Sequence, residues 1–134
     1  PAAPLPSLFD GLEPHELAPS LLHGDLWAGN VGSVRSDGAG GGGGAGCGAD
    51  EERVALLYDP APYYGHAEAD FGIARMFGGF TRHFYDAYAA VLPRARGAER
   101  RALLYELHHH LNHYNIFGTA YRSGALRVLR ELVD

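Results

Sequence analysis

The sequence predicts a mostly helical α+β fold in which one small β-hairpin precedes a bundle of helices. Two observations carry this prediction. The apolar run VALLY at residues 54–58 follows a short stretch of strand character at 31–34, and a glycine-rich tract separates them, as in two strands joined by a long turn. From residue 66 onward, apolar residues recur at helical spacing in four successive segments. The 134 residues suit a single domain.

The hairpin is expected to carry an unusual tip. Residues 1–20 before it hold five prolines and read as an irregular lead-in, with one short helical turn at 13–17. Residues 36–50 are dominated by glycine and include Cys47, the one cysteine of the chain. This composition favours a flexible insert, because it buries too little surface to offset the entropy lost on ordering. The strand at 54–58 is expected to be buried, since all its residues are apolar or aromatic.

Four helices are expected after the hairpin, at residues 66–77, 80–92, 98–117 and 120–133. Gly78-Gly79 ends the first of them and Pro93 follows the second, as helix-stop signals do. Arg100 and Arg101, near the start of the third helix, are expected on the solvated surface. The third helix carries an apolar stripe of four residues: Leu104, Leu107, Leu111 and Tyr114.

Charge and composition narrow the class of protein. The formal charge is −5 and no basic stripe is present, so no nucleic-acid partner is expected. The longest apolar run is far short of a membrane span, so no membrane partner is expected. All 11 Lys and Arg positions are arginine. No targeting signal stands out at the start, and the compartment stays open between cytoplasm and plastid.

A candidate catalytic loop lies at residues 23–30, HGDLWAGN. His23, Asp25 and Asn30 match the kinase pattern of histidine, any residue, aspartate, four residues, asparagine. In phosphoryl transfer the aspartate orients the acceptor hydroxyl and takes its proton, while the asparagine oxygen helps to hold Mg²⁺. Asp59 follows the second strand of the hairpin, where the same template has its metal-binding aspartate.

These residues also have a purely structural interpretation. An isolated HGD followed by an asparagine arises by chance in many proteins. Asp25 could serve as a turn residue, and Asp59 before Pro60 could simply start a turn. The hairpin and the position of Asp59, taken together, favour the kinase interpretation.

Several strings resemble the fructosamine-3-kinase (ketosamine-3-kinase) family: LLHGDLWAGN, YDPAPYYGHAEAD, MFGGF, FYDAY and LNHYNIFG, in this order. The resemblance runs from about residue 21 to the end and is interrupted only by the glycine-rich insert. It implies the carboxyl-terminal lobe of a protein-kinase-like fold of the aminoglycoside-phosphotransferase type. It also implies ATP and Mg²⁺ as cofactors. The implied reaction phosphorylates the C3 hydroxyl of a fructosamine or ribulosamine, either small or attached to a protein lysine, and so leads to protein deglycation.

The resemblance assigns roles to four residues, and His23 is expected to support them. Asp25 would be the proton acceptor, and Asn30 and Asp59 would bind Mg²⁺. His23 is expected to hold the catalytic loop through hydrogen bonds rather than to act as an acid or base. Asp70 resembles an acidic residue that braces this loop in related folds.

Three further residues are candidates for the acceptor pocket. The indole of Trp27, directly after the dipeptide Asp-Leu, would stack on the sugar ring or else pack the loop against the helices. Tyr64 and His66 follow Asp59 closely along the chain and could line the same pocket. For these two residues, core packing is an equally good interpretation.

Two parts of the kinase template are not found within the 134 residues. The chain has no lysine to contact the α/β-phosphates, and the glycines at 38–48 lack the context of a phosphate loop. We therefore expect residues 1–134 to be a carboxyl-terminal lobe without its nucleotide lobe, inactive alone, with that lobe as its native partner surface. The alternatives are a non-catalytic helical interaction module, or a phosphotransferase acting on choline or aminoglycosides.

His109 and His113 raise one further alternative. They lie four residues apart in an expected helix, so both could face one zinc ion. No third ligand is evident in the sequence, and packing or hydrogen bonding is the favoured interpretation.

Overall fold

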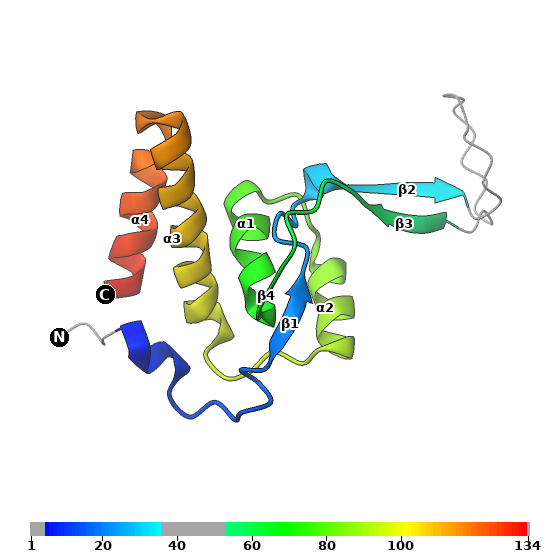
Figure 1. The fold of residues 1–134 in the computed structure, drawn as a ribbon, viewed down its shortest axis with the longest axis horizontal. Coiled ribbons are helices and arrows are strands. Elements are labelled where there is room, and N and C mark those ends of the chain that lie inside the picture. The colour runs from blue at the N-terminus through cyan, green and yellow to red at the C-terminus, as the bar shows by residue number, and fades with distance from the viewer. Residues whose placement is uncertain (1–4, 36–52, 134) are drawn as a thin grey trace.

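The computed structural model of the chain describes residues 5–35 and 53–133 (Figure 1), and the insert expected at 36–50, with Cys47, lies outside them. The strands are β1 (Pro19–Leu22), β2 (Val31–Arg35), β3 (Arg53–Leu57) and β4 (Tyr63–His66). The α-helices are α1 (Asp70–Phe77), α2 (Arg82–Val91), α3 (Ala98–Phe117) and α4 (Arg122–Val133). Short 3₁₀ turns cover Leu5–Phe9, Ala28–Asn30, Ala67–Ala69 and Thr119–Tyr121. The prediction of a mostly helical α+β fold is confirmed.

The predicted hairpin is formed by β2 and β3. The two strands pair antiparallel, with Val31 opposite Leu57 and Arg35 opposite Arg53. The expectation that the second strand is buried is wrong, because every residue of β3 is exposed. In Figure 1 the hairpin extends away from the helices, so no helix covers it among the described residues.

A second sheet joins β1 to β4, and it was not anticipated from the sequence. These strands are also antiparallel, with Pro19 opposite His66 and Leu22 opposite Tyr63. The first expected helix therefore begins late: residues 63–66 are strand, a 3₁₀ turn follows, and α1 starts at Asp70. The connection from β1 to β2 is the loop at residues 23–30, which lies where the two sheets meet.

Helix α3 lies between α1 and α4 and packs against both (Figure 1). Helix α2 packs on α1, where its Tyr85 and Tyr88 contact the ring of Phe71. The core between α3 and α4 contains four buried residues: Leu107, Ala125, Val128 and Leu132. On the other side, Gly72 lets α1 approach α3 closely, because an added Cβ would lie 2.6 Å from the backbone carbonyl carbon of Tyr105. None of the helices in the described ranges is long and apolar enough to cross a bilayer.

A buried ion pair ties the start of the chain to this core. Arg101 is 1% exposed, so the expectation that it lies on the solvated surface is wrong. Its guanidinium donates to both carboxylate oxygens of Glu68, each at 2.7 Å, and also to the backbone carbonyls of Leu8 and Arg96. A fully paired guanidinium fork can be buried in this way, whereas an unpaired one cannot. The partner lies 33 residues away along the chain, where no local pattern reveals it.

Candidate active site

The loop at residues 23–30 is held by a close approach of two backbone segments. Gly24 has φ +79°, and a Cβ at this position would clash with the carbonyl oxygen of Ala61. The amide of Ala61 in turn donates to the carbonyl of His23 at 2.9 Å. Only glycine has both the left-handed backbone freedom and the small size that this crossing needs.

Asp70 holds the same end of the loop through its carboxylate. Its two oxygens accept hydrogen bonds from the backbone amides of His23 at 2.9 Å and Gly24 at 2.8 Å. Asp70 is 6% exposed and is the first residue of α1, where the helix dipole also favours a negative charge. These contacts fix the backbone just before Asp25.

His23 joins the loop to the hairpin. Its Nδ1 accepts from the backbone amide of Asp25 at 3.3 Å, and its Nε2 lies 3.2 Å from the carbonyl oxygen of Tyr58. The neutral tautomer with hydrogen on Nε2 satisfies both contacts at once. His23 therefore has its two ring nitrogens engaged within the loop framework.

Asp25 and Asn30 lie side by side. The buried Asn30 amide nitrogen donates to Asp25 Oδ2 at 2.8 Å and to the Asp25 backbone carbonyl at 2.9 Å. Both amide hydrogens are used in these bonds, so the amide oxygen points away from Asp25 and is the atom offered to a cation. The second carboxylate oxygen of Asp25, Oδ1, lies outside this pair of bonds.

The hairpin brings Asp59 to the same place. The amide of Tyr58 donates to the carbonyl of Asn30 at 3.1 Å, and Asp59 is the next residue along the chain. Asp59 has φ +55°, a left-handed conformation that costs a non-glycine residue roughly 1 kcal/mol and is concentrated at functional sites. It turns the chain from β3 back toward His23.

Oxygen donors from Asn30 and Asp59 match what Mg²⁺ prefers, with phosphates and water completing the shell. Residues 5–35 and 53–133 contain no group of three or more His, Cys, Asp and Glu side chains able to hold a metal by themselves. The donor set thus suits a cation that arrives with phosphate oxygens, rather than one caged entirely by the protein.

The three candidate pocket residues are not brought together. Trp27 lies on the loop, with its indole over Gly29 and 5.0 Å from the ring of Phe77. Tyr64 is 74% exposed on β4. His66 is at the far end of β4, where its Nδ1 lies 2.8 Å from the hydroxyl oxygen of Tyr105, so the structure does not bring it to the loop.

Side chains of α1 and α3 lie beside the loop, and this neighbourhood was not predicted from the sequence. The ring of Phe77, at the end of α1, lies 5.5 Å from the ring of His113 on α3. One turn earlier, burial lowers the pKa of His109 to about 4, while the negative charge of Asp25 acts in the opposite sense. His109 is therefore neutral near pH 7 and close enough to Asp25 to respond to its charge. In the sequence, the only feature that pointed to this neighbourhood was the four-residue spacing of His109 and His113.

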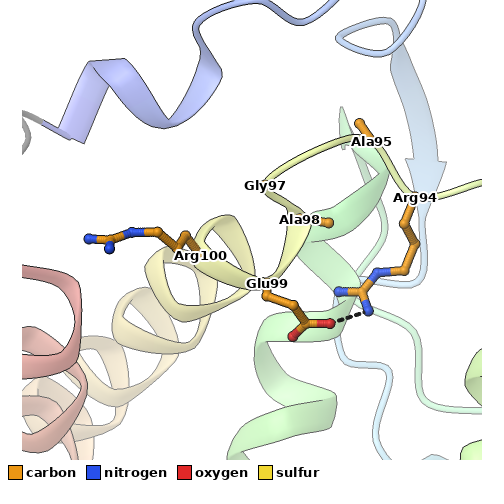
Figure 2. A pocket seen from close by; sticks show the side chains of 6 residues that line it. All are labelled: Arg94, Ala95, Gly97, Ala98, Glu99 and Arg100. Carbon is orange, nitrogen blue, oxygen red and sulfur yellow. Dashed lines mark hydrogen bonds and ion pairs between the residues drawn. The ribbon is translucent and has the colours of Figure 1, made fainter.

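Two hollows lie away from this loop. One hollow, of about 350 Å³, is lined by residues at the start of α3. Figure 2 shows that Arg94 donates a hydrogen bond to Glu99 there, while the side chain of Arg100 points away. The other, of about 230 Å³, is lined by residues including His66, Glu68 and Tyr88. Neither includes Asp25, Asn30 or Asp59 among its lining residues.

Comparison with known proteins identifies the family to which the chain belongs. The family model described as fructosamine kinase matches residues 6–134. The chain belongs to the fructosamine kinase family. The match includes every candidate residue, from His23 to His113.

Individual fructosamine kinases agree with the family match. The chain is 42% identical over 128 residues to a ketosamine-3-kinase of Mus musculus, covering 96% of this chain and 35% of the relative. It is 43% identical over 115 residues to a chloroplastic protein-ribulosamine 3-kinase of Arabidopsis thaliana, covering 86% of this chain and 30% of the relative. A solved structure of a fructosamine-3-kinase from Thermobifida fusca superposes with a TM-score of 0.69 at 35% identity, over 94% of this chain and 37% of that chain. The chain thus spans about a third of the length of these relatives.

Proposed function

We propose that this chain is the acceptor-activating part of an ATP-dependent ketosamine 3-kinase, which phosphorylates the C3 hydroxyl of ribulosamines or fructosamines on protein lysines. The observation that carries the proposal is the pairing of Asp25 with Asn30 beside Asp59, within a chain of the fructosamine kinase family. Relatives at 42–43% identity are named ketosamine-3-kinase and protein-ribulosamine 3-kinase. Phosphorylation at C3 would yield an unstable adduct that eliminates and frees the amine.

Asp25 would accept the proton of the C3 hydroxyl through Oδ1. Its other oxygen is held by Asn30 at 2.8 Å, which fixes the plane of the carboxylate and leaves Oδ1 for the acceptor. The backbone before Asp25 is held by the carboxylate of Asp70. A positioned base of this kind contributes about 10²–10⁴-fold to the rate.

Asn30 and Asp59 would hold Mg²⁺ through their side-chain oxygens, and the cation would neutralise charge on the transferred phosphoryl group. ATP contacts that kinases make through a lysine and a glycine-rich loop have no counterpart in these 134 residues. We therefore propose that residues 1–134 act as a carboxyl-terminal lobe, work together with a nucleotide-binding lobe, and have little activity without one.

A chimera tests this function. This chain is joined to the part of the mouse ketosamine-3-kinase that lies outside the match, and ATP-dependent phosphorylation of ribulosyl-lysine is followed by mass spectrometry. We expect activity in the chimera, at least about a 100-fold lower kcat in its Asp25→Asn variant, and none from the 134 residues alone. The matched control is Asp86→Asn on exposed α2, which should leave kcat unchanged.

The other outcomes separate the alternatives. A chimera that folds and binds ATP but transfers no phosphate would contradict the kinase function and favour a helical interaction module. Transfer to choline or an aminoglycoside, with none to ribulosyl-lysine, would assign a different acceptor class. Robust phosphorylation by the unfused chain would refute the dependence on a second lobe.

A further inference from the structure

Tyr58 links the loop at residues 23–30 to the hairpin through three hydrogen bonds. Its hydroxyl donates to the carbonyl of Gly29 at 2.8 Å, and its backbone amide donates to the carbonyl of Asn30 at 3.1 Å. Its own carbonyl oxygen lies 3.2 Å from Nε2 of His23, at the other end of the loop. Both ends of the loop are therefore bonded to the one residue that follows β3.

The hydroxyl bond completes the support of the peptide between Gly29 and Asn30. The carbonyl of this peptide accepts from Tyr58, and its amide donates to the carbonyl of Trp27 at 2.9 Å. The indole of Trp27 covers the same peptide, because a Cβ added at Gly29 would clash with the indole ring. Two hydrogen bonds and one close contact thus hold the backbone of Asn30 in its orientation.

The backbone orientation of Asn30 decides where its side-chain oxygen points. The amide nitrogen of Asn30 is already held by the carboxylate of Asp25 at 2.8 Å and by the backbone carbonyl of Asp25 at 2.9 Å. With the backbone and the amide nitrogen both held, the direction of the amide oxygen is set as well. That oxygen is one proposed ligand of Mg²⁺, and Asp59, the other, is joined to Tyr58 by a peptide bond.

The hydroxyl of Tyr58 can be removed without disturbing the packing of its ring. The residue is 47% exposed, and its ring lies beside β2, where a Cβ added at Gly32 would be in ordinary contact at 3.5 Å from Cε1. Phenylalanine has the same ring and keeps both backbone hydrogen bonds. Of the three bonds that Tyr58 makes to the loop, the substitution Tyr58→Phe therefore removes only the bond to Gly29.

We propose that Tyr58 is a positioning residue for divalent-cation binding, and that its hydroxyl sets the direction of the Asn30 amide oxygen relative to Asp59. The inference rests on the proposed function, because it takes Asn30 and Asp59 as the ligands of the cation. Mg²⁺ demands nearly octahedral coordination, whereas Ca²⁺ accepts flexible coordination. A residue that fixes the direction of a ligand should therefore affect Mg²⁺ binding more than Ca²⁺ binding.

Nuclear magnetic resonance of the 134-residue chain measures cation binding directly, without ATP or turnover. The ¹⁵N-labelled chain is titrated separately with Mg²⁺ and Ca²⁺, while the side-chain amide of Asn30 and the backbone amide of Asp59 are followed. We expect saturable shifts of both resonances in the parent. Tyr58→Phe should weaken Mg²⁺ binding about fivefold, as the loss of one hydrogen bond predicts, and Ca²⁺ binding less than about twofold.

Tyr85→Phe is the matched control. Tyr85 lies on α2, outside the loop and the hairpin, with its ring centroid 5.8 Å from that of Phe71. Removal of its hydroxyl should leave the affinity for both cations unchanged, and circular dichroism establishes that both variants are folded. In the chimera, Tyr58→Phe should raise KM for Mg²⁺ about fivefold while KM for ribulosyl-lysine is retained, a split that general loosening of the fold would not produce.

Several results would overturn the proposal. They are equal Mg²⁺ affinity of Tyr58→Phe and the parent, equal losses of Mg²⁺ and Ca²⁺ affinity, the same loss in Tyr85→Phe, or no saturable shift at Asn30 and Asp59 in the parent. If the chimera transfers no phosphate but the titrations are as expected, the proposed function is removed and Tyr58 remains a positioning residue of a cation site. If the chimera is active and Tyr58→Phe keeps the parent's KM for Mg²⁺, the proposed function stands and the role of Tyr58 is refuted.

Discussion

Replacement of Asp70 by asparagine tests whether the loop is held from α1. The carboxylate accepts two backbone hydrogen bonds, at 2.9 and 2.8 Å, and the residue is 6% exposed, so water cannot replace them. Hydrogen bonds to a charged group contribute about 1.5–3 kcal/mol each, and asparagine retains one neutral bond of about 1 kcal/mol. The second amide would face an NH₂ group. We therefore expect Asp70→Asn to lower the free energy of unfolding by about 3 kcal/mol.

Urea unfolding followed through Trp27, which lies on the held loop, measures this change. The matched control is Asp86→Asn, whose side chain is 63% exposed and pairs with Arg82, one turn away at 3.4 Å. An exposed i,i+4 pair of this kind contributes about 0.3–0.5 kcal/mol. If the two variants unfold at the same urea concentration, the carboxylate does not hold the loop in the way described.

Three further changes test the framework. Gly24→Ala puts a methyl against the carbonyl of Ala61 at positive φ, and should cost at least about 2 kcal/mol by thermal melting; an unchanged Tm would contradict the backbone crossing. Arg101→Met leaves Glu68 buried and unpaired, and should cost about 3–5 kcal/mol, much of it recovered in the double variant with Glu68→Met; a double variant as unstable as the single one would count against the pair. His109, with its pKa lowered from 6.5 to about 4, binds a proton more readily in the unfolded chain, so stability should fall as pH drops from 6.5 to 4. His109→Asn should remove part of that fall, about 1 kcal/mol given its partial exposure, and identical pH profiles would refute this assignment.

The local patterns of the sequence anticipated much of the fold. Helical periodicity together with Gly and Pro stop signals predicted α3 at 98–117, and the β2–β3 hairpin followed from two strand-like runs around a glycine-rich tract. The β1–β4 sheet escaped prediction because its strands are only four residues long and begin or end among Pro and Gly. A stretch such as YYGH has no alternation that could distinguish a strand from a loop.

Burial was predicted less well than secondary structure, because it depends on distant partners. The apolar run at 54–58 is exposed, since the hairpin extends away from the helices, while Arg101 is buried because Glu68 meets it from 33 residues away. On α3, the expected stripe drifts: Leu107 is in the core, but Leu111 is 46% exposed. Periodicity gives the face of a helix only where its packing partner follows the same face along its whole length.

The candidate site could be proposed from the spacing, the hairpin and the family resemblance, but the contacts that hold the loop could not be predicted. Helix α1 is eight residues long, about 12 Å, and it contacts the loop at both ends: Asp70 holds the backbone before Asp25, and Phe77 packs against Trp27. Gly72 lets the same helix pack closely against α3. The loop that carries Asp25 is therefore held by a helix that is itself packed closely against α3. A base that is fixed in this way would help to align an acceptor hydroxyl, and positioning of this kind can account for several kcal/mol of a phosphoryl-transfer barrier.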